Sequence, residues 1–267
     1  MSMKKKWLVV ILVSFLSVFV LFGCLPTQSE EEPEEPPEEP PEEETVMLKA
    51  YLPETTPATA TIYLVGSYSN FEFTDAATSE IKVDGEQMYA EFDISNLFED
   101  TDYPVKYKYT YDATWTCVET NESGGDIGDR RLEVAPQSDV EDVVLNWKGI
   151  DPIDYTDLQQ EITVNFIVHV PEGTEGDAIY MRGWNGDWDN SITLNKDADT
   201  GYYTIEATTV SYTAQGYKFL RMDNMDDNPK DDWAYVEKDA AGNDIGNRTY
   251  VLTDDATIVN VVESWAQ

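Results

Sequence analysis

The chain has 267 residues, enough for one or two domains, and each half is long enough to bury a core of its own. It carries 53 acidic residues against 17 Lys and Arg, which gives a formal net charge of -36. Such an acidic surface repels phosphate backbones and anionic headgroups, so it argues against a nucleic-acid partner and favours a neutral or cationic ligand. The acidity can equally serve only to keep an exposed protein soluble.

The amino terminus predicts an export signal. Residues 1–6 are basic and residues 7–22 are almost continuously apolar, a length that suits a signal peptide and is short for a membrane-spanning helix. The run ends in Leu21-Phe22-Gly23-Cys24, which resembles the bacterial lipobox, where a lipid is attached to the cysteine sulfur. We expect residues 1–23 to be a lipoprotein signal peptide and lipidated Cys24 to anchor an exported protein to the cell envelope, facing outside the cytoplasm. The alternative is an uncleaved signal anchor.

Residues 24–44 predict a disordered tether. Positions 30–44 contain only Glu and Pro, and both polyproline geometry and charge repulsion extend such a segment. At about 3.1 Å per residue this stretch can reach about 45 Å. After Cys24, only Cys117 remains, so no disulfide is expected within the mature chain.

The strongest internal signal is a sequence repeat. Two patterns recur at the same offset of 118 residues: Trp115-x-x-Val118-Glu119 as Trp233-x-x-Val236-Glu237, and Gly124-x-Asp126-Ile127-Gly128-x-Arg130 as Gly242-x-Asp244-Ile245-Gly246-x-Arg248. We therefore infer a duplicated domain, with copies at 45–150 and 161–267 joined by a linker at 151–160.

Each copy predicts an all-β fold. Short runs of β-branched and aromatic residues alternate with polar ones and are separated by Gly, Pro, Asn and Asp, with no convincing helical period. Several such strands in about 100 residues predict an antiparallel β-sandwich of immunoglobulin-like size. His169, the only histidine, falls within one of these alternating runs and is expected to be an ordinary strand residue.

Trp233 is a candidate for stacking on a sugar. In a strand it would share a face with Glu237, and a carboxylate on that face indicates solvent. An exposed indole can stack on the C–H face of a pyranose. Lys218, between Tyr217 and Phe219, is expected on the same face, where its ammonium can donate to sugar hydroxyls. The alternatives are a tryptophan covered by a loop and an ordinary solvated lysine.

The turn Gly183-Trp184-Asn185-Gly186-Asp187-Trp188-Asp189 carries two further tryptophans. Gly, Asn and Asp permit tight backbone geometry. Exposing two large rings in such a turn is costly without a purpose, so we favour binding over core packing for both Trp184 and Trp188.

Taken together, these motifs resemble the starch-binding domain of carbohydrate-binding module family 20. The resemblance covers nearly all of residues 161–267 and runs through Ile179-Tyr180, Gly183, Gly186-Asp187-Trp188, Gly216-Tyr217-Lys218-Phe219, Trp233, Asn247-Arg248-Thr249-Tyr250 and Trp265. It implies a β-sandwich with a shallow site in which Trp188 and Trp233 stack on glucose, while Lys218 and Asn247 bind its hydroxyls. It also implies a structural Arg248, which we expect to pair with Glu237.

The first copy departs from this pattern. It keeps Lys108 and Trp115, but Phe71 stands in place of Trp188 and Asp129 in place of Asn247. We expect weaker binding there, or a purely structural copy, with Tyr68 as a possible substitute platform.

The function predicted from the sequence is non-catalytic binding of starch, glycogen or malto-oligosaccharide at the cell surface, beside a separate amylase or sugar transporter. Catalysis is not expected, because two small sandwiches leave no room for a catalytic barrel and the sequence has no G-x-S-x-G, P-loop or H-E-x-x-H motif. No cofactor or metal site is expected either. Calcium at 197–199 or 223–232 is a weaker alternative, since neither has the spacing of a known loop. Two further alternatives stay open: a structural or adhesion lipoprotein that binds a protein partner, and a different polysaccharide as ligand.

Overall fold

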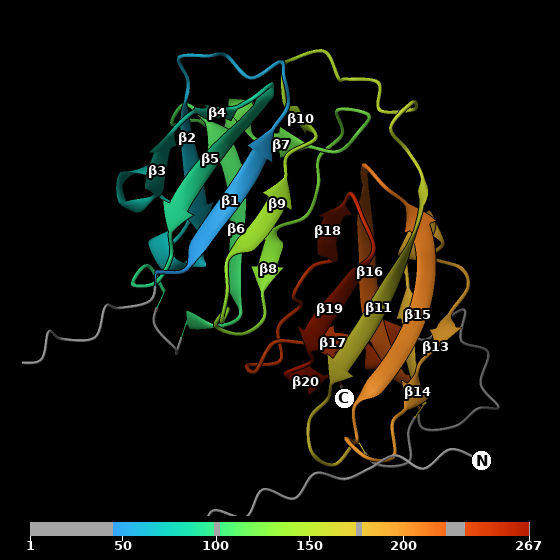
Figure 1. Cartoon of the computed structure of the whole chain (residues 1–267). Helices are drawn as coiled ribbons and strands as arrows, with labels where there is room; N and C mark the ends of the chain where they lie inside the picture. Colours follow the sequence, from blue (N-terminus) through green and yellow to red (C-terminus); the bar gives the residue numbers. More distant parts are fainter. Residues whose placement is uncertain (1–44, 99–101, 175–177, 223–232, 267) are drawn as a thin grey trace, which may run out of the picture. The chain divides into compact units, whose positions relative to one another are not determined.

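The computed structural model describes residues 45–98, 102–174, 178–222 and 233–266 (Figure 1). The predicted signal peptide, Cys24, the Glu/Pro tether and the acidic segment 223–232 lie outside the described residues. In the described part of the chain, no helix is both long enough and apolar enough to cross a membrane. The short 3-10 helices are η1 (Ser67–Ser69), η2 (Phe73–Asp75), η4 (Trp115–Cys117), η5 (Trp184–Gly186) and η6 (Trp233–Tyr235).

The first repeat contains two four-stranded sheets and a two-stranded ribbon. One sheet has the order β4 (Lys82–Asp84), β5 (Gln87–Asp93), β1 (Met47–Leu52), β9 (Val140–Val143). The other has the order β3 (Ala77–Glu80), β2 (Thr61–Gly66), β6 (Val105–Tyr111), β8 (Arg130–Leu132), and the ribbon pairs β7 (Glu119–Thr120) with β10 (Asn146–Trp147).

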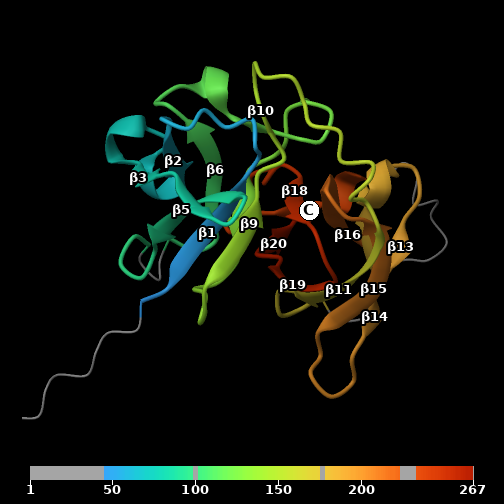
Figure 2. The same cartoon turned by 45° about the horizontal axis from the view of Figure 1, so that its top comes forward.

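The second repeat has the same strand order. Its sheets are β14 (Asn195–Lys196), β15 (Tyr203–Val210), β11 (Glu161–His169), β19 (Ala256–Val261), and β13 (Ile192–Thr193), β12 (Ala178–Arg182), β16 (Thr213–Met222), β18 (Arg248–Leu252). The ribbon pairs β17 (Glu237–Lys238) with β20 (Ser264–Trp265). Strands β1–β10 and strands β11–β20 gather into two neighbouring groups (Figure 2), and β18 of the second group lies beside β8 and β9 of the first.

The predicted all-β sandwich class is confirmed, with one correction to strand direction. In each repeat the first strand pairs in parallel with a late strand: β1 with β9, where Leu48 lies opposite Val140, and β11 with β19, where Val164 lies opposite Ala256. One sheet of each sandwich is therefore mixed rather than purely antiparallel. The alternation of apolar and polar residues determines which face a side chain takes, but not the direction of the neighbouring strand.

Alternation builds both cores. Along β11, Val164, Phe166 and Val168 are buried while the residues between them are more exposed. They pack with Tyr217 and Phe219 of β16. The first repeat is built in the same way on Leu48 and Ala50 of β1. Each repeat thus has an apolar core of its own.

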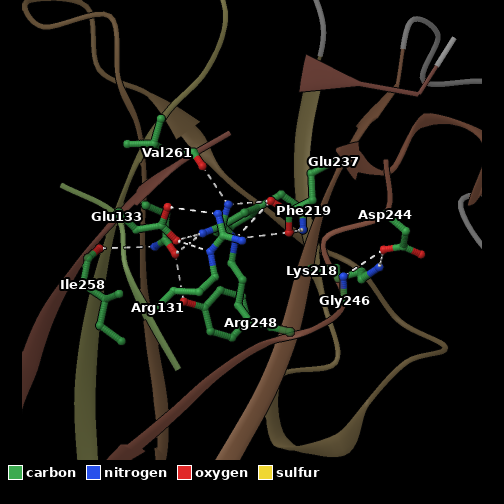
Figure 3. A network of polar contacts seen from close by, with 12 residues as sticks. Arg131, Glu133, Lys218, Phe219, Glu237, Asp244, Gly246, Arg248, Ile258 and Val261 are labelled. Carbon is green, nitrogen blue, oxygen red and sulfur yellow. Dashed lines mark hydrogen bonds and ion pairs between the residues drawn. The ribbon is translucent and has the colours of Figure 1, made fainter. Parts of the chain in front are cut away.

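A buried arginine links strands in each repeat. Arg248 of β18 donates to Glu237 at 2.7 Å, and Arg130 of β8 donates to Glu119 at 2.8 Å. The expected pairing of Arg248 with Glu237 is therefore present. Figure 3 shows Arg248 between Glu237 and a second carboxylate, that of Glu133 from the first repeat.

The segment predicted as a linker, 151–160, is packed in its middle. The Tyr155 hydroxyl donates to the Leu145 carbonyl at 2.5 Å, and the Tyr155 ring stacks on Tyr212 with centroids 5.3 Å apart. Residues Glu43–Gln267 form one compact unit. The segment 151–160 therefore packs against residues of both repeats through Tyr155.

Candidate functional site

Two tryptophans form a small aromatic platform on the second repeat. The rings of Trp188 and Trp233 have centroids 6.1 Å apart and planes inclined by 40°. Trp233 is 40% exposed and Trp188 is half-buried. The two residues that the resemblance assigned to stacking are therefore neighbours, and they present apolar surface to solvent.

The turn after β12 positions Trp188. The Gly183 N–H donates to the Asp187 carbonyl at 2.8 Å, and Gly183 has a φ of 90°. A Cβ at Gly183 would lie 2.4 Å from Cη2 of Trp188 and 2.6 Å from the Gly216 carbonyl oxygen. Only glycine fits both the backbone conformation and the space, so the indole lies directly against the main chain.

Trp233 is exposed for a different reason from the one predicted. It begins η6, a 3-10 turn, rather than lying in a strand. Glu237, whose carboxylate predicts a solvent-facing side of the strand, is fully buried. It accepts from Arg248 and, at 2.9 Å, from the Phe219 N–H. The expectation for Glu237 was wrong, because a carboxylate with a buried arginine partner can lie inside the fold.

Lys218 is less accessible than predicted. It is 7% exposed, and its Nζ donates to Oδ1 of Asp244 at 2.6 Å (Figure 3). That hydrogen bond, and a second one from the Gly246 N–H, lower the pKa of Asp244. The lysine is thus a buried partner of Asp244 rather than a freely solvated donor. Its ammonium carries three N–H groups, so it retains donor capacity beyond that contact.

Asn247 is exposed and directly precedes β18. It lines a shallow depression together with Gly216 and Thr249, and the two indoles do not line that depression. The structure therefore brings together Trp188 and Trp233, and places Asn247 in a neighbouring hollow.

Trp184 is a core residue, which corrects the prediction that it binds ligand. It is 3% exposed, and its Nε1 donates to the Thr208 carbonyl at 2.9 Å. Its ring packs edge-on against Phe166 and Tyr217. The same turn thus directs one tryptophan inward and the other outward.

The first repeat has an aromatic cluster at the equivalent place. Trp115 is 41% exposed, and the centroid of Phe71 lies 6.5 Å from its ring. Phe73 lies closer, at 5.1 Å with an interplanar angle of 53°. Sequence reasoning missed Phe73, although a second phenylalanine two positions after Phe71 was a usable signal.

Two other residues of the first repeat that were candidates for sugar binding make contacts within the fold instead. The Lys108 ammonium donates to the Ile127 carbonyl and lies 3.9 Å from Asp129, with its side chain mostly buried. The Tyr68 hydroxyl donates to the Leu64 carbonyl, and its ring packs against Phe98. Tyr68 is therefore held within the fold, and the idea that it could replace the missing platform is wrong.

Other polar groups form turns and packing contacts. Asp197 accepts from the N–H and the hydroxyl of Thr200, an arrangement typical of a turn. His169 lies in β11 as predicted and stacks on Tyr202 at 3.9 Å. Among the residues that the structure describes, no group of three or more His, Cys, Asp or Glu side chains could hold a metal ion.

No family model matches the chain, and no curated protein matches it. Among solved structures, a family 15 glucoamylase from Hypocrea jecorina is similar at 13% identity and a TM-score of 0.29. That match covers 50% of this chain but only 21% of the enzyme. A family 26 carbohydrate-binding module from Eubacterium rectale, solved with maltoheptaose, is similar at 10% identity and a TM-score of 0.24, covering 80% of this chain and 91% of the module.

A leucine-rich repeat protein from Bacteroides thetaiotaomicron is also similar, at 11% identity and a TM-score of 0.22. The match covers 81% of this chain and 26% of that protein. Likenesses this weak carry no argument about ligand or activity. The candidate site is therefore defined by its own residues, above all by Trp188 and Trp233.

Proposed function

We propose that the protein is a non-catalytic carbohydrate-binding lipoprotein whose second repeat binds an α-glucan of the starch or glycogen type. The observation that carries the proposal is the Trp188–Trp233 pair, two indoles 6.1 Å apart with open apolar surface. Indole rings stack on the apolar faces of sugar rings, and large exposed aromatics mark binding surfaces. The resemblance of the sequence motifs to starch-binding domains favours an α-glucan as the sugar.

The inclination of the two rings fits a curved chain better than a flat one. An α-1,4-glucan coils, so the mean planes of successive glucose units are inclined to one another, whereas a β-1,4-glucan is an extended ribbon in which successive units flip over but keep nearly parallel planes. Planes inclined by 40° can each meet one unit of a coiled chain. A flat polysaccharide would favour coplanar rings.

A neutral ligand agrees with the charge of the molecule. With a net charge of -36 the protein repels anionic polysaccharides, while a neutral glucan experiences no such field. Binding through stacking and hydrogen bonds is accordingly expected to change little with ionic strength.

The location proposed is the outer face of the cell envelope. Cleavage before Cys24 and lipidation of its sulfur would anchor the chain. The Glu/Pro segment would then hold the repeats away from the membrane, where they capture glucan for a neighbouring amylase or transporter. The Phe71–Trp115 cluster of the first repeat would supply a second, weaker site and increase avidity.

Retention on insoluble starch tests the proposal. We expect the wild-type chain to bind and Trp188→Ala or Trp233→Ala each to abolish retention while the protein stays folded. Val259→Ala, which also removes exposed apolar surface but lies on β19, is the matched control and should bind normally. Lack of retention by the wild type, or normal retention by both tryptophan variants, would rule the proposal out.

A glycan array distinguishes the α-glucan from another polysaccharide. Selective signal from maltodextrins is the expected result, and selective signal from a different sugar would keep the binding role but change the ligand. A protein partner captured regardless of added maltodextrin would instead favour the adhesion alternative.

A further inference from the structure

The two repeats support their exposed tryptophans differently. Arg182 ends β12 directly before Gly183, and the corresponding residue of the first repeat, directly before Gly66, is Val65. Both side chains are buried, with Arg182 only 1% exposed. Burying a guanidinium costs several kcal/mol before its partners are counted, and valine fills this position in the first repeat without that cost. Packing alone therefore does not explain the arginine.

The guanidinium of Arg182 lies under the Trp233 ring. Its Cζ is 5.3 Å from the ring centroid, within the range of a cation–π contact. Its Nε donates to Oγ of Ser191 at 2.7 Å, which fixes the orientation of the planar group. One face of the indole is thus held against a rigid, charged support.

The next residue holds the other indole. Gly183 lies against Cη2 and Cζ2 of Trp188, with no room for a side chain between them. Two consecutive residues, the last of β12 and the first of the following turn, therefore contact the two rings of the platform. Among the described residues of the first repeat, no cation lies over the Trp115 ring: Val65 replaces Arg182, and Trp115 packs on Phe73 instead.

We infer that Arg182 is a positioning residue for the platform: it holds the inner face of Trp233 so that the ring stays next to Trp188 and its outer face is free for ligand. The importance of this support for sugar binding rests on the proposed function. The placement of the ring itself does not, so the two can be tested separately.

Arg182→Met tests the inference, because methionine is unbranched and apolar and removes the charge. Two indoles at this spacing should give an exciton couplet in the circular dichroism spectrum, assigned by its loss in Trp233→Phe. In Arg182→Met we expect the couplet to weaken, acrylamide quenching of fluorescence to increase, and Kd for maltoheptaose to rise about tenfold. Arg182→Lys, which keeps a cation, should recover most of each signal.

An Arg182→Met protein with an unchanged couplet and unchanged quenching would overturn the inference, whatever its affinity. If Arg182→Lys and Arg182→Met weakened the couplet equally, the inference would also be overturned, because the positive charge at position 182 would then not be what holds the Trp233 ring. Should Arg182→Met fail to fold, Arg182→Gln replaces it with the same expectations. If the wild type shows the couplet but binds no maltoheptaose, the proposed function fails while the spectra still decide the role of Arg182.

Discussion

Trp184 and Trp188 lie in one seven-residue turn and have opposite environments. The Trp184 ring fills the core between Phe166 and Tyr217, and its N–H is satisfied by the Thr208 carbonyl. Trp188 instead rests on the Gly183 backbone and faces Trp233. The composition of the turn does not predict which tryptophan is buried. That depends on Gly183 and Asn185, whose left-handed backbone conformations change the direction of the chain within the turn.

Truncating these two tryptophans should therefore affect different properties. Trp184→Ala leaves a large cavity in the core and should lower the free energy of unfolding by about 3–5 kcal/mol. Trp188→Ala should cost less than about 1.5 kcal/mol, since the ring is only half-buried, and should act on binding instead. Urea denaturation of both variants measures the difference. Equal losses of stability would contradict the assignment of Trp184 to the core.

The ion pair between Lys218 and Asp244 joins strand β16 to the segment before β18. Hydrogen bonds from Lys218 and the Gly246 N–H lower the pKa of Asp244 below its ordinary value of 3.8. Because the folded pKa is the lower one, the pair's contribution is fully present above pH 3.8 and is lost as the pH falls through the folded pKa. Asp244 is largely exposed, which limits that contribution to about 1 kcal/mol or less.

Asp244→Asn should accordingly be less stable than the wild type near neutral pH by at most about 1 kcal/mol. The difference should vanish in acid, once the wild-type carboxyl is itself protonated. Urea midpoints measured at a series of pH values check this. A difference that persists at low pH would mean that the carboxylate charge is not the source of the contact.

The elements show what sequence patterns can and cannot specify. Alternation locates strands such as β11, and the constant offset between repeats anticipates two copies with one strand order. The parallel pairing of β1 with β9 was not predictable, because a period of two specifies a face and not a neighbour. Glu237 was misplaced for a related reason: its partner Arg248 lies on another strand, so its burial depends on a tertiary contact.

The candidate site was also predictable only where local sequence motifs, rather than tertiary contacts, determine it. Trp188 and Trp233 were identified because their motifs carry the resemblance, and the structure brings them together. Lys218 was expected in solvent because its neighbours Tyr217 and Phe219 face the core. It is buried because Asp244, from a separate segment, covers its charged end. Phe73 and Arg182 were missed, since their roles appear only when the chain brings them against Trp115 and Trp233.

The two repeats differ in which carboxylates neutralise their buried arginine. Arg130 is held by Glu119 and, at 3.0 Å, by Asp142. In the second repeat the residue equivalent to Asp142 is Asn260, and the second carboxylate on Arg248 is Glu133 of the first repeat (Figure 3). Burial lowers the pKa of Arg248, but Glu237 and Glu133 more than offset this, so the net pKa lies above its ordinary value and the guanidinium stays charged.

Because Glu133 of the first repeat neutralises Arg248 of the second, the stability of the second repeat should depend on the first repeat. Glu133→Gln should lower stability by about 1.5–3 kcal/mol, the usual value of a hydrogen bond to a charged group. Asn260→Asp, which supplies the carboxylate locally as in the first repeat, should restore the part of the loss that comes from Arg248. The part that comes from the ion pair of Glu133 with Arg131, at 3.0 Å, should remain. Urea unfolding of the two single variants and the double variant gives the coupling. Additive effects of the two substitutions would contradict a shared role at Arg248.

The proposed joint binding of an α-glucan by Trp188 and Trp233 can be measured by isothermal titration. Maltoheptaose is titrated into the wild-type chain and into the double variant Trp188→Ala/Trp233→Ala. We predict saturable heat for the wild type and loss of most of it in the double variant, with both proteins folded by circular dichroism. No heat with the wild type, or the same heat from a folded double variant, would contradict the claim.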